Sequence, residues 1–110
     1  MVTISTSSPS QLLQRFKKAI DDKHVVTWKY YGDGDFTHTP EQWANKAYMR
    51  PSVEAGQLKF NIVKTASLVV TTSVYAIYHG RMIESFLEHF DQSFGNAYGT
   101  ALPTAGDMVK

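Results

Sequence analysis

The most chemically varied group of side chains in this 110-residue sequence lies in one short stretch, and it comprises Tyr75, Tyr78, His79 and Arg81. A buried imidazole titrates near neutrality and can serve as a general acid or base, so His79 with a neighbouring tyrosine in a pocket would suit an enzyme. No partnered nucleophile or carboxylate shares its predicted helical face. That absence favours a packed histidine bonded to a backbone carbonyl or to a tyrosine.

Motifs that would indicate a known catalytic chemistry are missing. The sequence contains no GxSxG, HExxH, Walker A, GxGxxG or CxxC pattern. It also has no cysteine, which excludes disulfides, thiolate metal ligands and a cysteine nucleophile. We therefore predict that the protein acts by binding, without a cofactor, and keep the enzyme with His79 as a third hypothesis.

One loop carries side chains that a divalent cation accepts. Gly32-Asp33-Gly34-Asp35 and the nearby His38 offer two carboxylates and an imidazole. The segment lacks the glycine and glutamate that a calcium-binding hand places at its sixth and twelfth loop positions. Glycine and aspartate are also the residues that tight turns select, so we interpret this segment as a turn and predict no metal site.

The predicted strands carry cations and tyrosines at alternate positions. We expect a strand over 24–31 and a hairpin of 47–53 and 57–64 around Gly56, whose place in the turn suits a positive φ. If Val26, Trp28 and Tyr30 face the helices, alternation puts eight residues on the outer face. These are Thr27, Lys29, Tyr31, Tyr48, Arg50, Ser52, Lys59 and Asn61.

This outer face contains three cations, two tyrosines and no carboxylate. Aromatic rings and cations on an exposed sheet are typical of surfaces that bind single-stranded nucleic acid. Binding of nucleic acid or another anion is therefore an alternative function, and its candidate residues are Lys29, Tyr31, Tyr48, Arg50 and Lys59. A polar outer face is also the ordinary state of an antiparallel sheet, and no RNP-type motif is present.

A second candidate surface lies at the start of the last predicted helix. Val74, Ile77 and Tyr78 fall off the main apolar face of that helix. Apolar groups that do not join a core often contact a partner protein or a second copy of the chain. The segment from Val74 to Tyr78 is rich in β-branched residues, so a strand remains possible there, and in that case the trio is simply buried.

The helices are indicated by capping residues and by apolar spacing. Ser8-Pro9-Ser10-Gln11 precedes a stripe formed by Leu12, Leu13, Phe16 and Ile20. A second stripe runs at about 100° per residue through the later segment. Its members are Tyr75, Ala76, His79, Met82, Ile83, Phe86, Leu87 and Phe90. The pattern at Thr39-Pro40 predicts a short helix through Trp43 to Lys46.

Together these elements predict an α+β domain. We expect a three- to four-stranded antiparallel sheet with two amphipathic helices, N-terminal and C-terminal, on one face. Residues 1–8 and 95–110 are predicted to be flexible or irregular, and Pro51 is predicted to lie at a sheet edge or bulge. The 110 residues suit one domain. No stretch suits a signal peptide or a membrane span, so we expect a cytoplasmic protein that does not enter a membrane.

The run Tyr75-Ala76-Ile77-Tyr78-His79-Gly80-Arg81, followed by Glu84, Leu87 and His89-Phe90-Asp91, resembles a YxxYHGR-like helix of short uncharacterised bacterial proteins. The resemblance covers about a fifth of the chain and implies a bacterial, cytosolic origin and a helix, with no function attached. Our leading hypothesis is a protein-interaction module, binding an unknown protein or forming a homodimer through Val74, Ile77 and Tyr78.

Overall fold

The computed structural model describes residues 1–110 and contains two helices and six strands. In chain order the elements are β1 (Val2–Ser5), α1 (Pro9–Asp21), β2 (Trp28–Tyr30), β3 (Phe36–His38), β4 (Ala47–Glu54), β5 (Gln57–Lys64), α2 (Thr72–His89) and β6 (Ala97–Gly99). The predicted α+β class is confirmed, but the sheet has more strands than we expected. Neither helix has the length and apolar character needed to traverse a bilayer.

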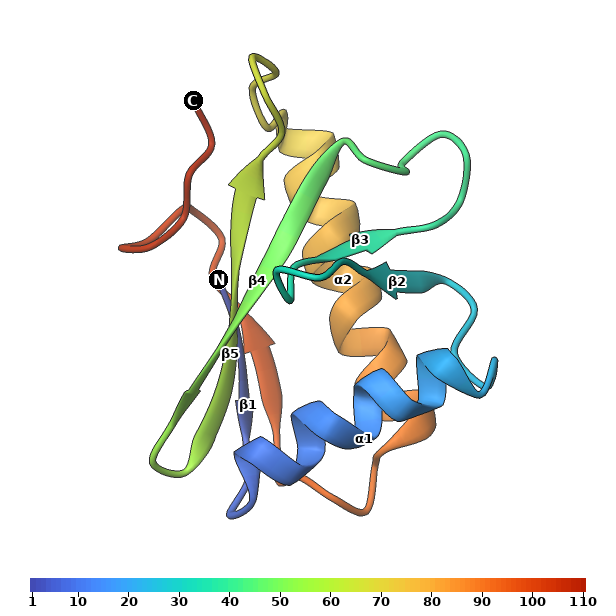
Figure 1. The fold of residues 1–110 in the computed structure, drawn as a ribbon. Helices are drawn as coiled ribbons and strands as arrows, with labels where there is room; N and C mark the ends of the chain where they lie inside the picture. The colour runs from blue at the N-terminus through green and yellow to red at the C-terminus, as the bar shows by residue number, and fades with distance from the viewer.

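The six strands form one antiparallel sheet in the order β2-β3-β4-β5-β1-β6. Both helices lie on the same side of this sheet, and β2 and β3 cross in front of α2 (Figure 1). The Phe16 ring from α1 lies 4.8 Å from the Phe86 ring of α2 and 6.3 Å from the Phe60 ring of β5. The core is therefore shared by both helices and the sheet.

The helix α1 begins where the sequence predicted. Ser8 occupies the N-cap position and Pro9 lies in the first turn, although the Ser8 side chain makes no capping hydrogen bond. Proline suits this turn because its missing N–H would have no helical partner there. Leu12 and Phe16 of the apolar stripe are buried against the sheet.

The segment from Val74 to Tyr78, for which the sequence allowed either a strand or a helix, is helical. Thr71 caps α2 by accepting a hydrogen bond from the Val74 N–H at 3.2 Å, and the helix then continues to His89. Because the cap satisfies a donor that would otherwise have no partner, it offsets the weak helix preference of the β-branched Val74 and Ile77.

The hairpin of β4 and β5 is confirmed, with Gly56 at φ +78° in its turn. Pro51 pairs with Phe60 on one side, whereas β3 reaches β4 only at Met49. From Pro51 onward β4 therefore pairs with β5 alone. The N–H that proline lacks costs no hydrogen bond to a second strand.

Three local predictions in the first half are wrong. The strand predicted over 24–31 is reduced to Trp28–Tyr30, and Val26 is 66% exposed rather than facing the helices. Residues 36–38, which we did not expect to be extended, form β3. The helix predicted after Thr39-Pro40 is a hydrogen-bonded turn, in which the carbonyl of Pro40 accepts from Trp43 and Ala44.

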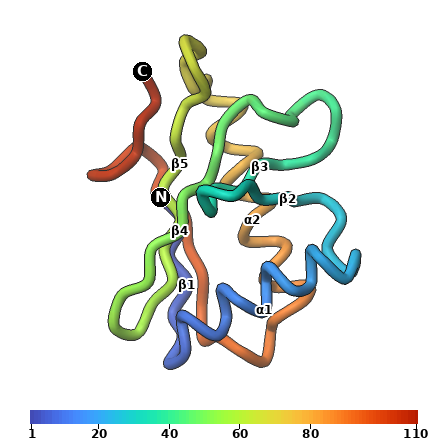
Figure 2. Tube along the Cα trace, in the orientation of Figure 1, coloured from blue at the N-terminus to red at the C-terminus, as the bar shows by residue number.

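The prediction that residues 1–8 and 95–110 are flexible or irregular is wrong where each end forms a strand. Residues 2–5 form β1, which is buried between β5 and β6, and 97–99 form β6. The strands β1 and β6 thus run side by side, as the blue and orange-red stretches of the tube show (Figure 2). Beyond β6 the tail returns to β5, where Met108 exchanges backbone hydrogen bonds with Ile62 and Lys64.

Candidate functional site

The predicted partner-binding trio does not form a surface. Tyr78 is fully buried and Val74 is nearly so, both within the hydrophobic core, while Ile77 is half-buried against that core. The Tyr78 ring meets the Trp28 ring edge-on, with centroids 5.6 Å apart, and its hydroxyl lies 3.0 Å from the Thr37 hydroxyl. Our placement of these residues on an exposed contact surface is corrected, because β2 and β3 fold across this side of α2.

A different stripe of α2 faces outward. We call Ala76, Gly80, Ile83 and Leu87 the outer stripe; they follow one another at intervals of four, three and four residues. Leu87 is 55% exposed, Ala76 and Gly80 are exposed, and Ile83 is half-buried, with part of its side chain packed against the core beside Gly99. This spacing is that of the seam along which two helices pack.

The outer stripe borders a shallow hollow. The hollow has a volume of about 720 Å³ and is lined by Gly80, Ile83, Glu84, Leu87 and Glu88. A Cβ atom built on Gly80 would meet no atom within 4 Å, and the glycine has an ordinary helical backbone. Glycine in a helix interior costs about 1 kcal/mol relative to alanine, and nothing within the chain requires it here.

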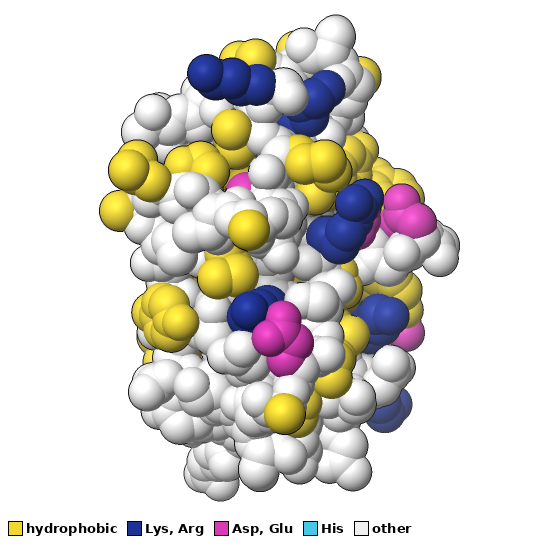
Figure 3. All heavy atoms as spheres, turned by 90° about the vertical axis from the view of Figure 1, so that its left-hand side faces the viewer, with side chains coloured by type: hydrophobic (Ala, Val, Ile, Leu, Met, Phe, Trp, Pro, Cys, Tyr) yellow, Lys and Arg dark blue, Asp and Glu magenta, His cyan; other side chains and the backbone are white.

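The basic outer face of the sheet is less basic than the sequence indicated. Arg50 forms two hydrogen bonds with the carboxylate of Asp35, at 3.1 and 2.9 Å, and Lys59 pairs with Glu54 at 3.1 Å. Two of the three predicted cations are therefore neutralised locally. On this side of the molecule the Lys and Arg side chains lie apart from one another, and carboxylates accompany some of them (Figure 3).

The tyrosines of that face do come together. The rings of Tyr31 and Tyr48 meet edge-on with centroids 5.9 Å apart, and both hydroxyls donate to Oδ1 of Asn45, at 2.8 and 3.4 Å. The ammonium of Lys29 lies 5.4 Å from the centroid of the Tyr31 ring. Lys29, Tyr31, Tyr48 and Arg50 are thus neighbours or near neighbours, whereas Lys59 lies on β5 beside Glu54.

The side chains that we considered as metal ligands do not converge. Asp35 is held by Arg50, and Asp33 accepts the backbone N–H of Asp35 at 3.0 Å, as expected of a turn. Nδ1 of His38 bonds to the carbonyl of Thr27, and its ring packs 4.7 Å from that of Trp28. Burial lowers the pKa of His38.

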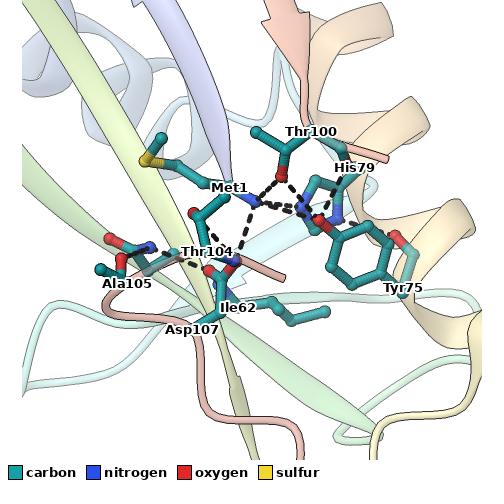
Figure 4. A network of polar contacts seen from close by, with 9 residues as sticks. Met1, Ile62, Tyr75, His79, Thr100, Thr104, Ala105 and Asp107 are labelled. Atoms are coloured by element: carbon teal, nitrogen blue, oxygen red, sulfur yellow. Dashed lines mark hydrogen bonds and ion pairs between the residues drawn. The ribbon is translucent and has the colours of Figure 1, made fainter. Parts of the chain in front are cut away.

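His79 belongs to a polar network that joins both ends of the chain. The α-ammonium of Met1 contacts four groups, shown converging from α2 and the C-terminal segment in Figure 4. These are the Tyr75 hydroxyl at 3.2 Å, His79 Nε2 at 2.8 Å, the Thr100 hydroxyl at 2.9 Å and Asp107 Oδ2 at 3.1 Å.

The hydrogen bonds define the tautomer of His79. Nδ1 lies 2.7 Å from the carbonyl oxygen of Tyr75, which only accepts, so Nδ1 carries the proton and Nε2 accepts from the ammonium. Burial and the adjacent positive charge of Met1 lower the pKa of His79 to about 4. Both ring nitrogens are therefore engaged in holding the chain together, which is the packed-histidine interpretation.

Asp107 balances the charge of this network. Its side chain is fully buried and also accepts from the N–H groups of Thr104 and Ile62 and from the amide of Asn61. Burial raises the pKa of Asp107, but the hydrogen bonds from Thr104, Asn61 and Met1 outweigh it, so the pKa is lowered. No local pattern in the sequence indicated this network, because its members come from the start of the chain, from α2 and from the tail that returns to β5.

Acid is expected to destabilise the protein through His79. The pKa is about 4 in the folded chain and about 6.5 when unfolded, so below pH 6.5 the unfolded state binds more protons. The stabilising contribution is complete above pH ~6.5 and is lost progressively as the pH falls towards ~4; between pH 7 and pH 5 the loss is about 2 kcal/mol. Urea unfolding at pH 7 and pH 5 measures the loss.

The substitution His79→Gln is expected to reduce the difference between the two pH values, and His24→Gln, at an exposed site, serves as the control. An unchanged pH dependence in His79→Gln would contradict the assignment. Some dependence should remain, because the lowered pKa of His38 acts in the same direction.

Two features of these sites were missed at the sequence level. Asn45 adopts φ +58° and presents one oxygen to two tyrosines, and the outer stripe was partly assigned to the core. Asparagine tolerates this backbone conformation well, but nothing local predicts where its side chain points.

Searches against protein-family models, curated proteins and solved structures found no match to this chain.

Proposed function

We propose that the protein is an interaction module that forms a homodimer, in which the outer stripe of α2 packs antiparallel against the outer stripe of a second copy. The single observation that carries this proposal is the order of residue sizes along the stripe. The small residues Ala76 and Gly80 come first, and the large residues Ile83 and Leu87 follow.

A twofold axis makes this order self-complementary. Antiparallel pairing centred between Gly80 and Ile83 places Leu87 against Ala76 of the second copy and Ile83 against Gly80. Each large side chain then fills the space above a small one, as symmetric interfaces between identical chains require. The open space above Gly80 allows the two helices to approach closely.

The charges beside the stripe agree with the same arrangement. Arg81 and Glu84 lie on one flank and pair with each other at 3.0 Å within the chain. In the antiparallel dimer the same flanks of both copies meet, which brings Arg81 near Glu84 of the second copy on each side of the axis. Exchange of partners would then link the copies without leaving a charge unpaired, and these exposed pairs would add little to the affinity.

The experiment is the solution mass by light scattering over a concentration series. One chain has a mass of 12.4 kDa, and we expect the measured mass to rise towards twice that value with concentration. A mass that stays at one chain throughout would contradict the homodimer. The mass should respond little to salt, because the stripe itself is apolar.

Nucleic-acid binding on the outer sheet face has less support. Arg50 and Lys59 already have carboxylate partners, which leaves Lys29 as the cation of that group without an ion pair. Adding a single-stranded oligonucleotide to the light-scattering series at low salt tests it directly, because such binding weakens steeply as salt is added.

A further inference from the structure

We propose that the hollow beside the paired rings of Tyr31 and Tyr48 binds a guanidinium group. The hollow has a volume of about 550 Å³ and is lined by Tyr31, Asp33, Asp35, Asn45 and Tyr48. It shares no residue with the outer stripe, so this inference stands independently of the dimer.

The aromatic walls of the hollow are held in place. Tyr31 follows β2 and Tyr48 lies in β4, so the two rings come from separate strands. Asn45 fixes both by accepting from both hydroxyls, and its own N–H is bonded to the Thr37 hydroxyl at 3.1 Å. A site whose walls are already ordered loses little conformational entropy when a ligand binds.

Apart from the amide nitrogen of Asn45, the polar side-chain atoms of the lining are acceptors. Both tyrosine protons are directed to Asn45, which leaves the lone pairs of the phenol oxygens and of the carboxylates. Asp35 is neutralised by Arg50, but Asp33 takes part in no ion pair of the chain. The lining therefore offers the carboxylate of Asp33, which forms no ion pair, and contains no cation; Arg50 lies outside the lining, and its pKa is raised by Asp35 and, to a smaller extent, by Asp33.

A guanidinium group matches this lining in three respects. It is positively charged, it is planar and stacks on aromatic faces, and it carries five N–H donors with no acceptor. The position of Lys29 over the Tyr31 ring shows that this ring already attracts a cation from outside the lining. A quaternary ammonium ion lacks donors and would give the carboxylate of Asp33 no hydrogen bond beyond the one from the Asp35 N–H.

The test is a titration with methylguanidinium chloride, followed by NMR shifts of the Tyr31 and Tyr48 rings and of the backbone amides of 31–48. We expect saturable shifts confined to this region, with a dissociation constant in the millimolar range. Tetramethylammonium chloride should bind more weakly. Sodium chloride at equal ionic strength should produce no saturable shift, and equal effects of all three salts would overturn the proposal.

Two charge variants identify the site. Asp33→Asn keeps the oxygen that accepts the Asp35 N–H but removes the charge, and it should weaken binding about fivefold or more. Asp91→Asn changes the net charge equally at an exposed position and should leave binding unchanged. Equal behaviour of the two variants would contradict a site at Asp33.

Lys29→Gln separates a cation site from the anion site that the sequence suggested. Removing the neighbouring positive charge should tighten methylguanidinium binding by about twofold or more. An anion site would instead lose affinity for inorganic phosphate, and phosphate shifts at the tyrosines that Lys29→Gln abolishes would overturn the proposal.

A Gly-Arg-Gly peptide with blocked termini shows whether the guanidinium group belongs to an arginine of a partner protein or to a free small ligand. Tighter binding of the peptide than of methylguanidinium would indicate an arginine in a partner protein, since the peptide backbone then adds contacts. Equal affinity would indicate a free small ligand with the same group. Failure of both probes to bind would overturn the proposal, whatever the oligomeric state of the protein.

Discussion

Replacing Leu87 with lysine is expected to weaken the dimer by about 100-fold or more. Each copy contributes one Leu87, which is 55% exposed in the single chain and packs against Ala76 of the second copy in the proposed arrangement. Burying a leucine side chain stabilises by roughly 1.5 to 3 kcal/mol, and each 1.4 kcal/mol corresponds to about tenfold in affinity. Sedimentation equilibrium measures the change in dissociation constant.

The same substitution should leave the folded chain intact. Lysine is a good helix former, and at residue 87 it lies near the C-terminus of α2, where the helix dipole favours a cation. Leu102→Lys, at a position that is 76% exposed, is the matched control and should dimerise as the original chain does. Equal weakening by both variants would indicate a general loss of apolar surface and would contradict the assigned stripe.

Asp107→Ala is expected to cost about 3 to 5 kcal/mol of unfolding free energy. The substitution removes the only carboxylate that faces the Met1 ammonium and leaves donors of Thr104, Asn61 and Ile62 without their partner. Breaking a buried pair is costly because the remaining charge is uncompensated. Urea unfolding measures this cost, which is a large fraction of the ~5 to 15 kcal/mol of a typical domain.

Hydrogen exchange shows where the stability is lost. The N–H groups of Lys64 and Met108 bond across the junction of β5 with the tail, so their exchange should accelerate more than that of the β4–β5 hairpin. Asp91→Ala, at an exposed position, is the control and should change the stability by less than about 0.5 kcal/mol. A similarly small effect of Asp107→Ala would contradict the claim that the polar network around Met1 stabilises the packing of the C-terminal tail.

The elements with strong local signals were predictable. The proline and the apolar spacing after Ser8 identified α1, and Gly56 identified the hairpin. The helix α2 was identified by its spacing, but its orientation was not. Whether Tyr78 or Leu87 faces the core depends on where β2 and β3 cross the helix, and that is a tertiary relation without a local signal.

The strands β1 and β6 were missed for a related reason. Segments of four and three residues are too short for alternation to be recognised. The strand β1 is stabilised by pairing with β5 and β6, and β6 is stabilised by pairing with β1. The ion pair of Arg50 with Asp35 likewise joins a strand to a turn. A surface that looked basic from alternation alone therefore carries carboxylates.

The most direct test of the proposed dimer is disulfide formation by a Gly80→Cys variant. The chain has no other cysteine, and a side chain at this position meets nothing within 4 Å. In the antiparallel arrangement the two copies of residue 80 lie beside the twofold axis, near the ~4 to 7 Å that a disulfide spans between Cα atoms. Ser67→Cys, in an exposed loop, gives the rate of random collision. We predict that mild oxidation links Gly80→Cys into dimers much faster than Ser67→Cys; equal rates would contradict a dimer built on this face of α2.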